Sequence, residues 1–195
     1  EASHTAVTAG AIFGTLETRI DTWENVKASG AYTTVKAISN GSGKDVYVGS
    51  LAGEVNNVSV YGFNNEISNG IYIAISLNNV SGNSIASSFV GVLNAGKNLV
   101  YENIKFIDYE NIDVSSVIKN STGSSKNVYG ALGFGLINGS SKVDINSIDF
   151  IYSSGKENLS NLYMSSIRCS TADVNSKGNA YAGGLIAYSS NSNVY

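Results

Sequence analysis

Apolar and polar residues alternate with a period of two along much of the chain. The clearest case is residues 71–77, in which isoleucine or leucine stands at every second position with Tyr, Ala and Ser between them. Two further apolar runs, at 46–52 and 58–63, precede it, and Asn and Gly steps lie between or beside these runs. Alternation bounded by such residues is typical of half-buried strands. The pattern therefore predicts three or four short strands in each stretch of about 40 residues.

One segment, residues 15–27, fits a different period. Leu16, Ile20 and Trp23 follow the spacing of a helix face, and Val26 continues it. Apolar residues three and four positions apart are typical of an amphipathic helix. Two interpretations therefore remain open for this segment, one short helix or a pair of strands.

A short pattern recurs along the chain: a glycine, any residue, and then leucine or isoleucine. Its five copies begin 39, 42, 39 and 53 residues apart. They are Gly10 with Ile12, Gly49 with Leu51, Gly91 with Leu93, Gly130 with Leu132, and Gly183 with Leu185. Aromatic residues flank the last four copies, at Tyr47, Phe89, Tyr129 and Tyr181. Because self-similarity at a near-constant period is the signature of a repeat protein, we interpret these residues as a structural repeat.

The repeat favours a solenoid over a sandwich or a closed barrel, which also contain many evenly spaced strands. We predict an all-β, single-stranded parallel β-helix, or β-solenoid, in which each coil stacks on the one before. At about 20–25 residues per coil, residues 1–195 would form one domain of about eight or nine coils. The absence of proline agrees with a parallel β-helix, because a strand paired on both sides needs every backbone N–H. Two Ser- and Gly-rich stretches, 120–127 and 152–161, are predicted to project as loops.

The composition supports strands and turns. Val and Ile total 36 residues against 10 Leu, and Tyr and Phe add 12 and 6; β-branched and aromatic residues suit a pleated sheet. Ser, Asn and Gly, at 30, 24 and 21 residues, supply turns. A net charge of -3 with 43% apolar residues excludes a typical disordered chain, which combines few apolar residues with high charge.

Charge and hydropathy also exclude two classes of partner. The lysines are scattered and the isoelectric point is near 5.1, so no basic stripe is present for nucleic acid. No apolar run approaches the roughly 20 residues that span a bilayer. The chain begins at Glu1 and ends at Tyr195 within a strand-like stretch. We therefore expect a fragment of a longer surface protein.

Residues 181–192 resemble the GLUG-motif repeats, and residues 47–53 are a second copy of that pattern. Ala11, Ser50 and Val92 stand where the family has a second glycine. Such repeats occur in large bacterial surface and secreted proteins, among them haemagglutinin-like adhesins and autotransporter passengers. The resemblance implies a right-handed parallel β-helix, a location outside the cell or on the bacterial outer membrane, and a role in adhesion and virulence. It brings no catalytic residues.

Residues able to carry catalysis or bind a cofactor are few. The chain has one histidine, His4, and one cysteine, Cys169. Zinc sites draw mainly on these residue types, and a Ser-His-Asp centre needs a well-placed histidine. We therefore predict no catalytic residue, metal or cofactor, and we expect Cys169 to be a buried strand residue.

Carboxylates are the remaining candidates for chemistry. Asp108, Glu110 and Asp113 form an acidic cluster, and Asp144 with Asp149 forms a further pair. Strand alternation would place Asp108 and Glu110 on one face. Three interpretations are open: solvated outward side chains, which we favour, a weak calcium site, or a catalytic pair.

Tyrosine is the most informative surface residue in the sequence. Its apolar ring and polar hydroxyl suit contacts with both sugars and proteins. The candidates in strand-rich parts of the chain are Tyr32, Tyr61, Tyr101, Tyr109, Tyr152 and Tyr163. A face lined by such residues would bind a glycan or a host protein.

These observations predict a non-enzymatic surface or secreted module, the stalk or binding region of an adhesin or autotransporter passenger. It would attach to ligands on a host or on a cell surface. The alternative is a polysaccharide-active β-helix enzyme, such as a lyase, a hydrolase or a phage-type depolymerase. A toxin passenger and an ice-binding solenoid are less favoured, the latter because the nine threonines are scattered.

Overall fold

The computed structural model describes residues 6–17, 22–40, 44–78, 82–107, 112–119, 125–151, 166–171, 176–190 and 193–195. Within these ranges every helix or strand assigned is a strand. Every pair formed by the described strands is parallel. The predicted all-β class with parallel strands is therefore confirmed.

Two of the three sheets contain five strands each in the described part of the chain. In sheet A the spatial order is β1 (Ala6–Gly10), β4 (Asp45–Gly49), β7 (Ser84–Ser87), β11 (Val128–Ala131) and β16 (Ala180–Gly183). In sheet B the order is β17 (Ile186–Ser190), β12 (Phe134–Gly139), β8 (Val90–Ala95), β5 (Ala52–Asn56) and β2 (Phe13–Glu17).

Sheet C is larger and is organised around one long strand. Its main order is β15 (Ser166–Thr171), β10 (Ile112–Lys119), β6 (Ser59–Asn78), β9 (Leu99–Ile107), β13 (Lys142–Ile145) and β18 (Asn193–Val194). In addition, β3 (Thr22–Asn40) pairs with β6, and β14 (Ile148–Ile151) pairs with β9. The first half of β6 lies beside β9 and its second half lies beside β10.

The chain visits sheets A, B and C in that order and then returns to sheet A. The described strands make five such circuits, which we call passes: β1 to β3, β4 to β6, β7 to β10, β11 to β15, and β16 to β18. Strand pairing places Gly10 beside Gly49 and Val128 beside Ala180, so a whole repeat of the sequence separates neighbouring strands. The expected eight or nine coils are therefore wrong, because one repeat spans all three sheets.

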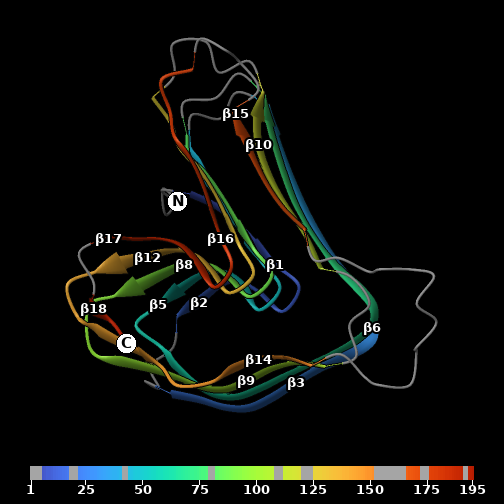
Figure 1. The fold of residues 1–195 in the computed structure, drawn as a ribbon, viewed down its shortest axis with the longest axis vertical. Coiled ribbons are helices and arrows are strands. Elements are labelled where there is room, and N and C mark those ends of the chain that lie inside the picture. The colour runs from blue at the N-terminus through green and yellow to red at the C-terminus, as the bar shows by residue number, and fades with distance from the viewer. Residues whose placement is uncertain are drawn as a thin grey trace.

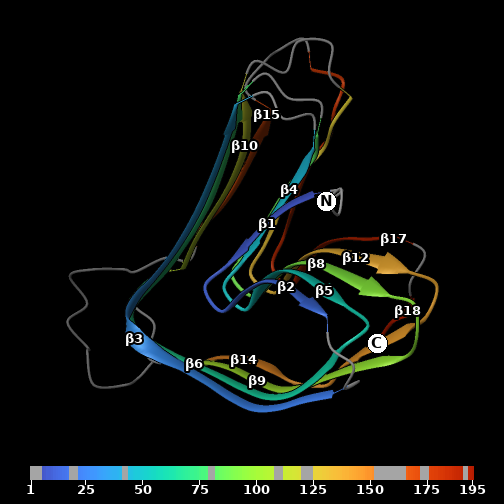
Figure 2. The same cartoon turned by 180° about the vertical axis from the view of Figure 1, so that it is seen from behind.

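Sheet C bends and thereby divides the molecule into a body and an arm (Figures 1 and 2). In the body, the first halves of β3 and β6 run with β9 and β14 on the side opposite sheet B. In the arm, β10 and β15 pack against strands of sheet A. Sheet A thus has one face turned to the arm and the other turned outward.

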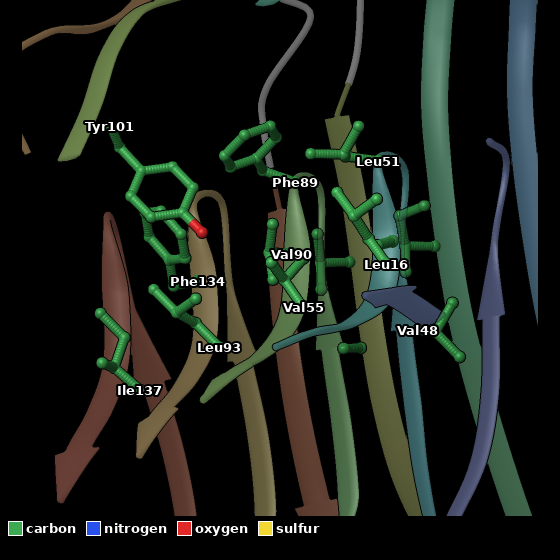
Figure 3. Packing of buried hydrophobic residues seen from close by; sticks show 14 of the residues in the cluster. Leu16, Val48, Leu51, Val55, Phe89, Val90, Leu93, Tyr101, Phe134 and Ile137 are labelled. Carbon is green, nitrogen blue, oxygen red and sulfur yellow. The ribbon is translucent and has the colours of Figure 1, made fainter. Parts of the chain in front are cut away.

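Aromatic rings fill the body. Phe89 lies among them, with its ring centroid 5.2 Å from that of Phe63 and 5.5 Å from that of Phe134. Tyr101 packs edge-on against Phe134 at 5.0 Å (Figure 3). Edge-to-face pairs of this kind add about 0.5–1.5 kcal/mol each beyond the area they bury. All four rings are fully buried.

The arm shows the alternation that the sequence predicts. Ile71, Ile73 and Ile75 are at most 1% exposed, whereas Tyr72 and Ala74 between them are half-buried. The three isoleucines belong to the same apolar cluster as the body. One continuous core therefore runs through both parts of the molecule.

A left-handed residue interrupts the alternation in three neighbouring strands. Asn25, Gly62 and Asn103 have φ angles of 54°, 76° and 55° and lie in adjacent register. The interruption moves the next inward-facing side chain by one position, so Trp23 is followed by Val26. That spacing of three is why the sequence there also fits a helical period. The helix alternative is wrong, because this part of the chain forms strands in β2 and β3.

A five-residue corner joins each strand of sheet A to the next strand of sheet B. Aligned by strand pairing, the corners are residues 10–14, 49–53, 87–91, 131–135 and 183–187. Their backbones bond between passes, as in the 2.9 Å bond from the Leu51 N–H to the Phe89 carbonyl. A Cβ on Gly49 would lie 2.2 Å from the carbonyl oxygen of Ala52. In pass 2 the absence of a Cβ at Gly49 therefore permits this close approach.

The predicted repeat glycines occupy three different places in this arrangement. Gly10, Gly49 and Gly183 hold the first corner position, which is filled by Ser and Ala in passes 3 and 4. Gly91 holds the fifth corner position, and Gly130 precedes its corner by one residue. The third and fourth copies of the sequence pattern are therefore out of register with the others.

The apolar partners of these glycines divide in the same way. Ile12, Leu51 and Leu185 hold the third corner position, whereas Leu132 holds the second and Leu93 lies in β8. Leu51 is fully buried between neighbouring passes, but Ile12 and Leu185 are 36% and 40% exposed. The difference follows from their positions in the first and last described passes.

Candidate functional site

The outward faces of sheets A and B meet at the corners and form a crease that runs along the stack. In each pass, a side chain of sheet A lies next to one that follows it by seven residues in sheet B. The A/B crease consists of the pairs Thr8 and Thr15, Tyr47 and Glu54, Ile85 and Val92, Tyr129 and Leu136, and Tyr181 and Tyr188. Strand register stacks each pair on the next.

Three tyrosines cluster at one end of the A/B crease. The rings of Tyr129 and Tyr181 are stacked, with centroids 5.0 Å apart and planes 11° apart. Tyr188 lies across the corner, 5.0 Å from Tyr181 and 6.0 Å from Tyr129. Tyr188 is 41% exposed while Tyr129 is 7% exposed. The Tyr188 ring is therefore accessible to solvent, while the Tyr129 ring packed beneath it is buried.

The buried phenols of the crease stay protonated at neutral pH. Burial raises the pKa of Tyr129, although the Asn127 amide, which donates to its hydroxyl oxygen at 2.9 Å, opposes this. Burial also raises the pKa of Tyr47, and the negative charges of Asp45 and Glu54 raise it further. The Tyr47 hydroxyl donates to the Asp45 carboxylate at 3.2 Å. Neutral phenols can act as both hydrogen-bond donors and acceptors.

The opposite end of the crease is polar and hollowed. The Thr8 and Thr15 hydroxyls lie 3.1 Å apart beside a hollow of about 420 Å³ that Ala6, Val7 and Lys44 also line. The crease therefore changes in character along the stack, from hydroxyls at pass 1 to aromatic rings at pass 5.

A column of amide side chains borders the crease on sheet A. The Asp45 carboxylate accepts the backbone N–H of Asn83 at 2.7 Å and its side-chain amide at 3.1 Å. The Asn83 Oδ1 accepts the backbone N–H of Asn127 at 2.8 Å, and the Asn127 Oδ1 accepts that of Asn179 at 2.9 Å. In each step, a side-chain oxygen of one pass accepts a backbone N–H of the next pass, and these bonds link passes 2 to 5.

A second amide column borders the crease on sheet B. Asn56, Asn94 and Asn138 lie in register. The Asn94 amide donates to Asn56 Oδ1 at 2.7 Å and to Glu54 Oε1 at 2.9 Å. The crease is therefore flanked on both sides by fixed polar groups.

The predicted tyrosine face is not the surface that the structure presents. Tyr101 is fully buried, and its hydroxyl donates to the Val58 carbonyl at 2.9 Å, so its assignment to an exposed face is wrong. Tyr61 is half-buried and lines a hollow on sheet C. Tyr32 lies in β3, but its side chain is outside the described part. The other candidates outside the described residues are Tyr109, Tyr152 and Tyr163.

Three of the carboxylates singled out in the sequence lie in the described part of the chain, and each has a local partner. Asp113 accepts a bond from the Ser166 hydroxyl at 2.5 Å. Asp144 pairs with Lys142 at 2.8 Å, and Asp149 accepts from a serine hydroxyl at 3.3 Å. His4, Asp108 and Glu110 lie outside the described residues, as do residues 120–124 and 152–161 of the predicted loops.

Cys169 lies in β15 as a half-buried strand residue. Burial raises the pKa of its thiol to about 11, and the thiol donates to the Tyr181 carbonyl at 3.1 Å. Among the described residues, no three His, Cys, Asp or Glu side chains are grouped to hold a metal ion. No helix within those ranges has the length and apolar character needed to cross a membrane.

The positions of the tyrosines relative to the corners were a signal for the crease in the sequence. Aligning the repeats on their glycines did not show this signal. Two residues before a corner stand Tyr47, Tyr129 and Tyr181. Tyr188 stands in β17, the strand that follows the last corner. Aligning the chain on its corners would have grouped these four tyrosines.

Comparisons with family models, with curated proteins and with solved structures found no match to this chain. The candidate site therefore depends on its geometry alone.

Proposed function

We propose that the chain is a right-handed parallel β-helix that serves as a non-enzymatic attachment module of a bacterial surface or secreted protein. Its binding surface is the A/B crease, and its ligand is carried by a host or by another cell surface. The observation that carries the proposal is the tyrosine cluster of the crease, held on a stack of hydrogen-bonded passes. The resemblance to GLUG-motif adhesins and autotransporter passengers points to the same role.

The order of the sheets supports the β-helix. A chain that visits three parallel sheets in a fixed order, five times, winds about a common axis. Parallel crossover connections are right-handed in almost all proteins, which supports the proposed hand. Each pass is stabilised by contacts with its neighbours, so a stalk could be lengthened by adding passes without a new fold.

The chemistry of the crease supports attachment. Tyrosine is enriched where proteins meet their ligands, because its rigid ring buries a large area while its hydroxyl remains paired or hydrated. Tyr181 and Tyr188 supply two such rings side by side. The carboxylates Asp113 and Asp144 are engaged with Ser166 and Lys142, which favours a binding role over catalysis by those groups.

A bead-attachment assay tests this function. Beads coated with the purified chain are applied to cultured epithelial monolayers, washed and counted. We expect more beads to adhere than albumin-coated ones, and the double variant Tyr181→Ser, Tyr188→Ser to weaken adhesion about tenfold. A tenfold loss corresponds to about 1.4 kcal/mol, more than the roughly 1 kcal/mol that most interface residues cost when they are truncated.

The matched control is Tyr195→Ser, which removes a tyrosine that is 70% exposed and outside the crease. Its adhesion should equal that of the unsubstituted chain. Adhesion no greater than that of albumin beads, or an equal loss in the control, would show that the crease is not the attachment surface.

A further inference from the structure

A second hollow lies on the outward face of sheet C, away from the A/B crease. It has a volume of about 250 Å³, and three adjacent strands, β3, β6 and β9, supply its walls. Its lining residues, which define the Tyr61 hollow, are Glu24, Asn25, Tyr61, Gly62, Asn64, Asn103 and Lys105. Pockets for drug-sized ligands occupy about 300–1,000 Å³. The Tyr61 hollow therefore matches a smaller group, about one sugar ring in size.

The left-handed residues run through this hollow. Asn25, Gly62 and Asn103, all at positive φ, are neighbours across the three strands. A non-glycine residue in this conformation costs on the order of 1 kcal/mol, and such residues gather at binding sites. A Cβ on Gly62 would lie 3.1 Å from the Asn25 side-chain oxygen, so glycine keeps the middle of the hollow open.

The side chains of the hollow are free to bind. Within the described residues, Glu24, Tyr61, Lys105 and the three asparagines make no side-chain hydrogen bond or ion pair. Nearby on the same sheet, Lys27 and Glu66 are already paired at 2.8 Å. The hollow thus concentrates unpaired polar groups on a sheet that also carries the Lys27–Glu66 ion pair.

This set of groups fits a sugar. The Tyr61 ring offers an apolar face for the C–H groups of a pyranose. The Glu24 carboxylate accepts hydrogen bonds, the Lys105 ammonium donates them, and the amides do both, which suits adjacent hydroxyl groups. One negative and one positive side chain balance each other, so the hollow favours a ligand without net charge.

We propose that the Tyr61 hollow binds a single uncharged hexopyranose unit of a glycan. The site is separate from the A/B crease and does not depend on the proposed attachment function. It would give the module a second contact, on another face, with a glycosylated surface.

Saturation-transfer difference NMR on the whole chain tests the proposal. The probes are the methyl glycosides of glucose, galactose and mannose, together with N-acetylglucosamine and, as a charged comparison, glucuronate. We expect transfer to the ring C–H protons of at least one neutral sugar, and weaker transfer to glucuronate. Tyr61→Ala should raise the dissociation constant at least about tenfold, and Tyr61→Phe should largely restore binding because it keeps the ring.

Two further variants keep the test independent of folding and of the crease. Glu24→Gln, at an exposed position, should weaken binding without altering the circular dichroism spectrum. Tyr188→Ala, in the crease, should leave sugar binding unchanged whatever it does to bead adhesion. The proposal is overturned if no neutral sugar shows transfer, if glucuronate binds best, or if Tyr61→Ala and Glu24→Gln leave the dissociation constant unchanged.

Discussion

At the scale of single residues, the corners depend on whether a Cβ has room. A Cβ on Gly49 would meet the Ala52 and Phe89 carbonyl oxygens at 2.2 and 2.6 Å, whereas one on Gly184 would meet nothing within 4 Å. We expect Gly49→Ala to lower the free energy of unfolding by about 1–3 kcal/mol, as overpacking does. Gly184→Ala, in a corner of the same kind, should change it by less than about 0.5 kcal/mol. Denaturant titration measures both, and equal effects would contradict the corner geometry.

Tyr101 gives the stability a dependence on alkaline pH. Burial raises its pKa above the ordinary value of 10.0, so above about pH 10 the unfolded chain loses this proton before the folded chain does. The free energy of unfolding should therefore fall as the pH rises through that range. Tyr101→Phe should reduce this slope. At neutral pH it should cost about 1–3 kcal/mol, because the Val58 carbonyl is left without its donor.

Denaturant titrations at pH 7 and above pH 10 check both parts. Tyr195→Phe is the control for the loss of a hydroxyl, because its ring is 70% exposed and its effect at pH 7 should stay within about 0.5 kcal/mol. A Tyr101→Phe variant with the slope of the unsubstituted chain would show that Tyr101 is not buried as described.

Residue patterns predicted the strands but not the direction of every side chain. Period-two counting holds from Ile71 to Ile75, where no left-handed residue intervenes. It fails across Gly62 and Asn103, where the chain shifts its inward positions by one. Tyr101 lies before Asn103 and faces the core in regular alternation with Leu99, although its hydroxyl suggested a surface position. In the sequence, a positive φ at an asparagine shows only as a spacing of three between apolar residues, and a helix face has the same spacing.

At the scale of strands and columns, the sequence predicted the period but not the register. The near-constant spacing of the repeat was visible, yet each repeat contains one strand of sheet A, one of sheet B and at least one of sheet C. The expected coil of about 20–25 residues is only about half of one repeat, so the expected number of coils was too high. Glycine alone could not fix the alignment, because Ser87 and Ala131 hold the corner position of Gly49 in two passes.

The amide column of sheet A should make a measurable contribution to stability. Asn83 bonds to Asp45 below it and accepts the backbone N–H of Asn127 above it. Asn83→Ala leaves that N–H unpaired, and we expect a loss of about 1–3 kcal/mol in the free energy of unfolding.

Asn179→Ala is the matched control for Asn83→Ala. It lies at the end of the column, and within the described residues its side chain makes no hydrogen bond. Its loss should stay within about 0.5 kcal/mol. If thermal or denaturant unfolding gives the same loss in the free energy of unfolding for both variants, the hydrogen bonds of the amide column do not stabilise the stacking of the passes.

At the scale of the whole molecule, the two proposed binding surfaces arise from stacking. The A/B crease brings together residues seven positions apart in one pass and residues a full repeat apart between passes, so no local motif contains it. The sequence marked the tyrosines that flank the repeat, and only the pairing of strands shows that two of them, Tyr129 and Tyr181, touch Tyr188. The Tyr61 hollow likewise draws on three strands that are distant in the chain.

The central structural claim is that five passes stack in register, with one pass per repeat. Dipolar electron paramagnetic resonance tests it with spin labels on Glu17→Cys and Ser190→Cys in a Cys169→Ala background. The two labelled positions lie in one column of sheet B, four strand steps apart. At about 4.8 Å per step, their backbones should be about 19 Å apart. A separation of about 40 Å, which twice as many strand steps would give, would contradict the account.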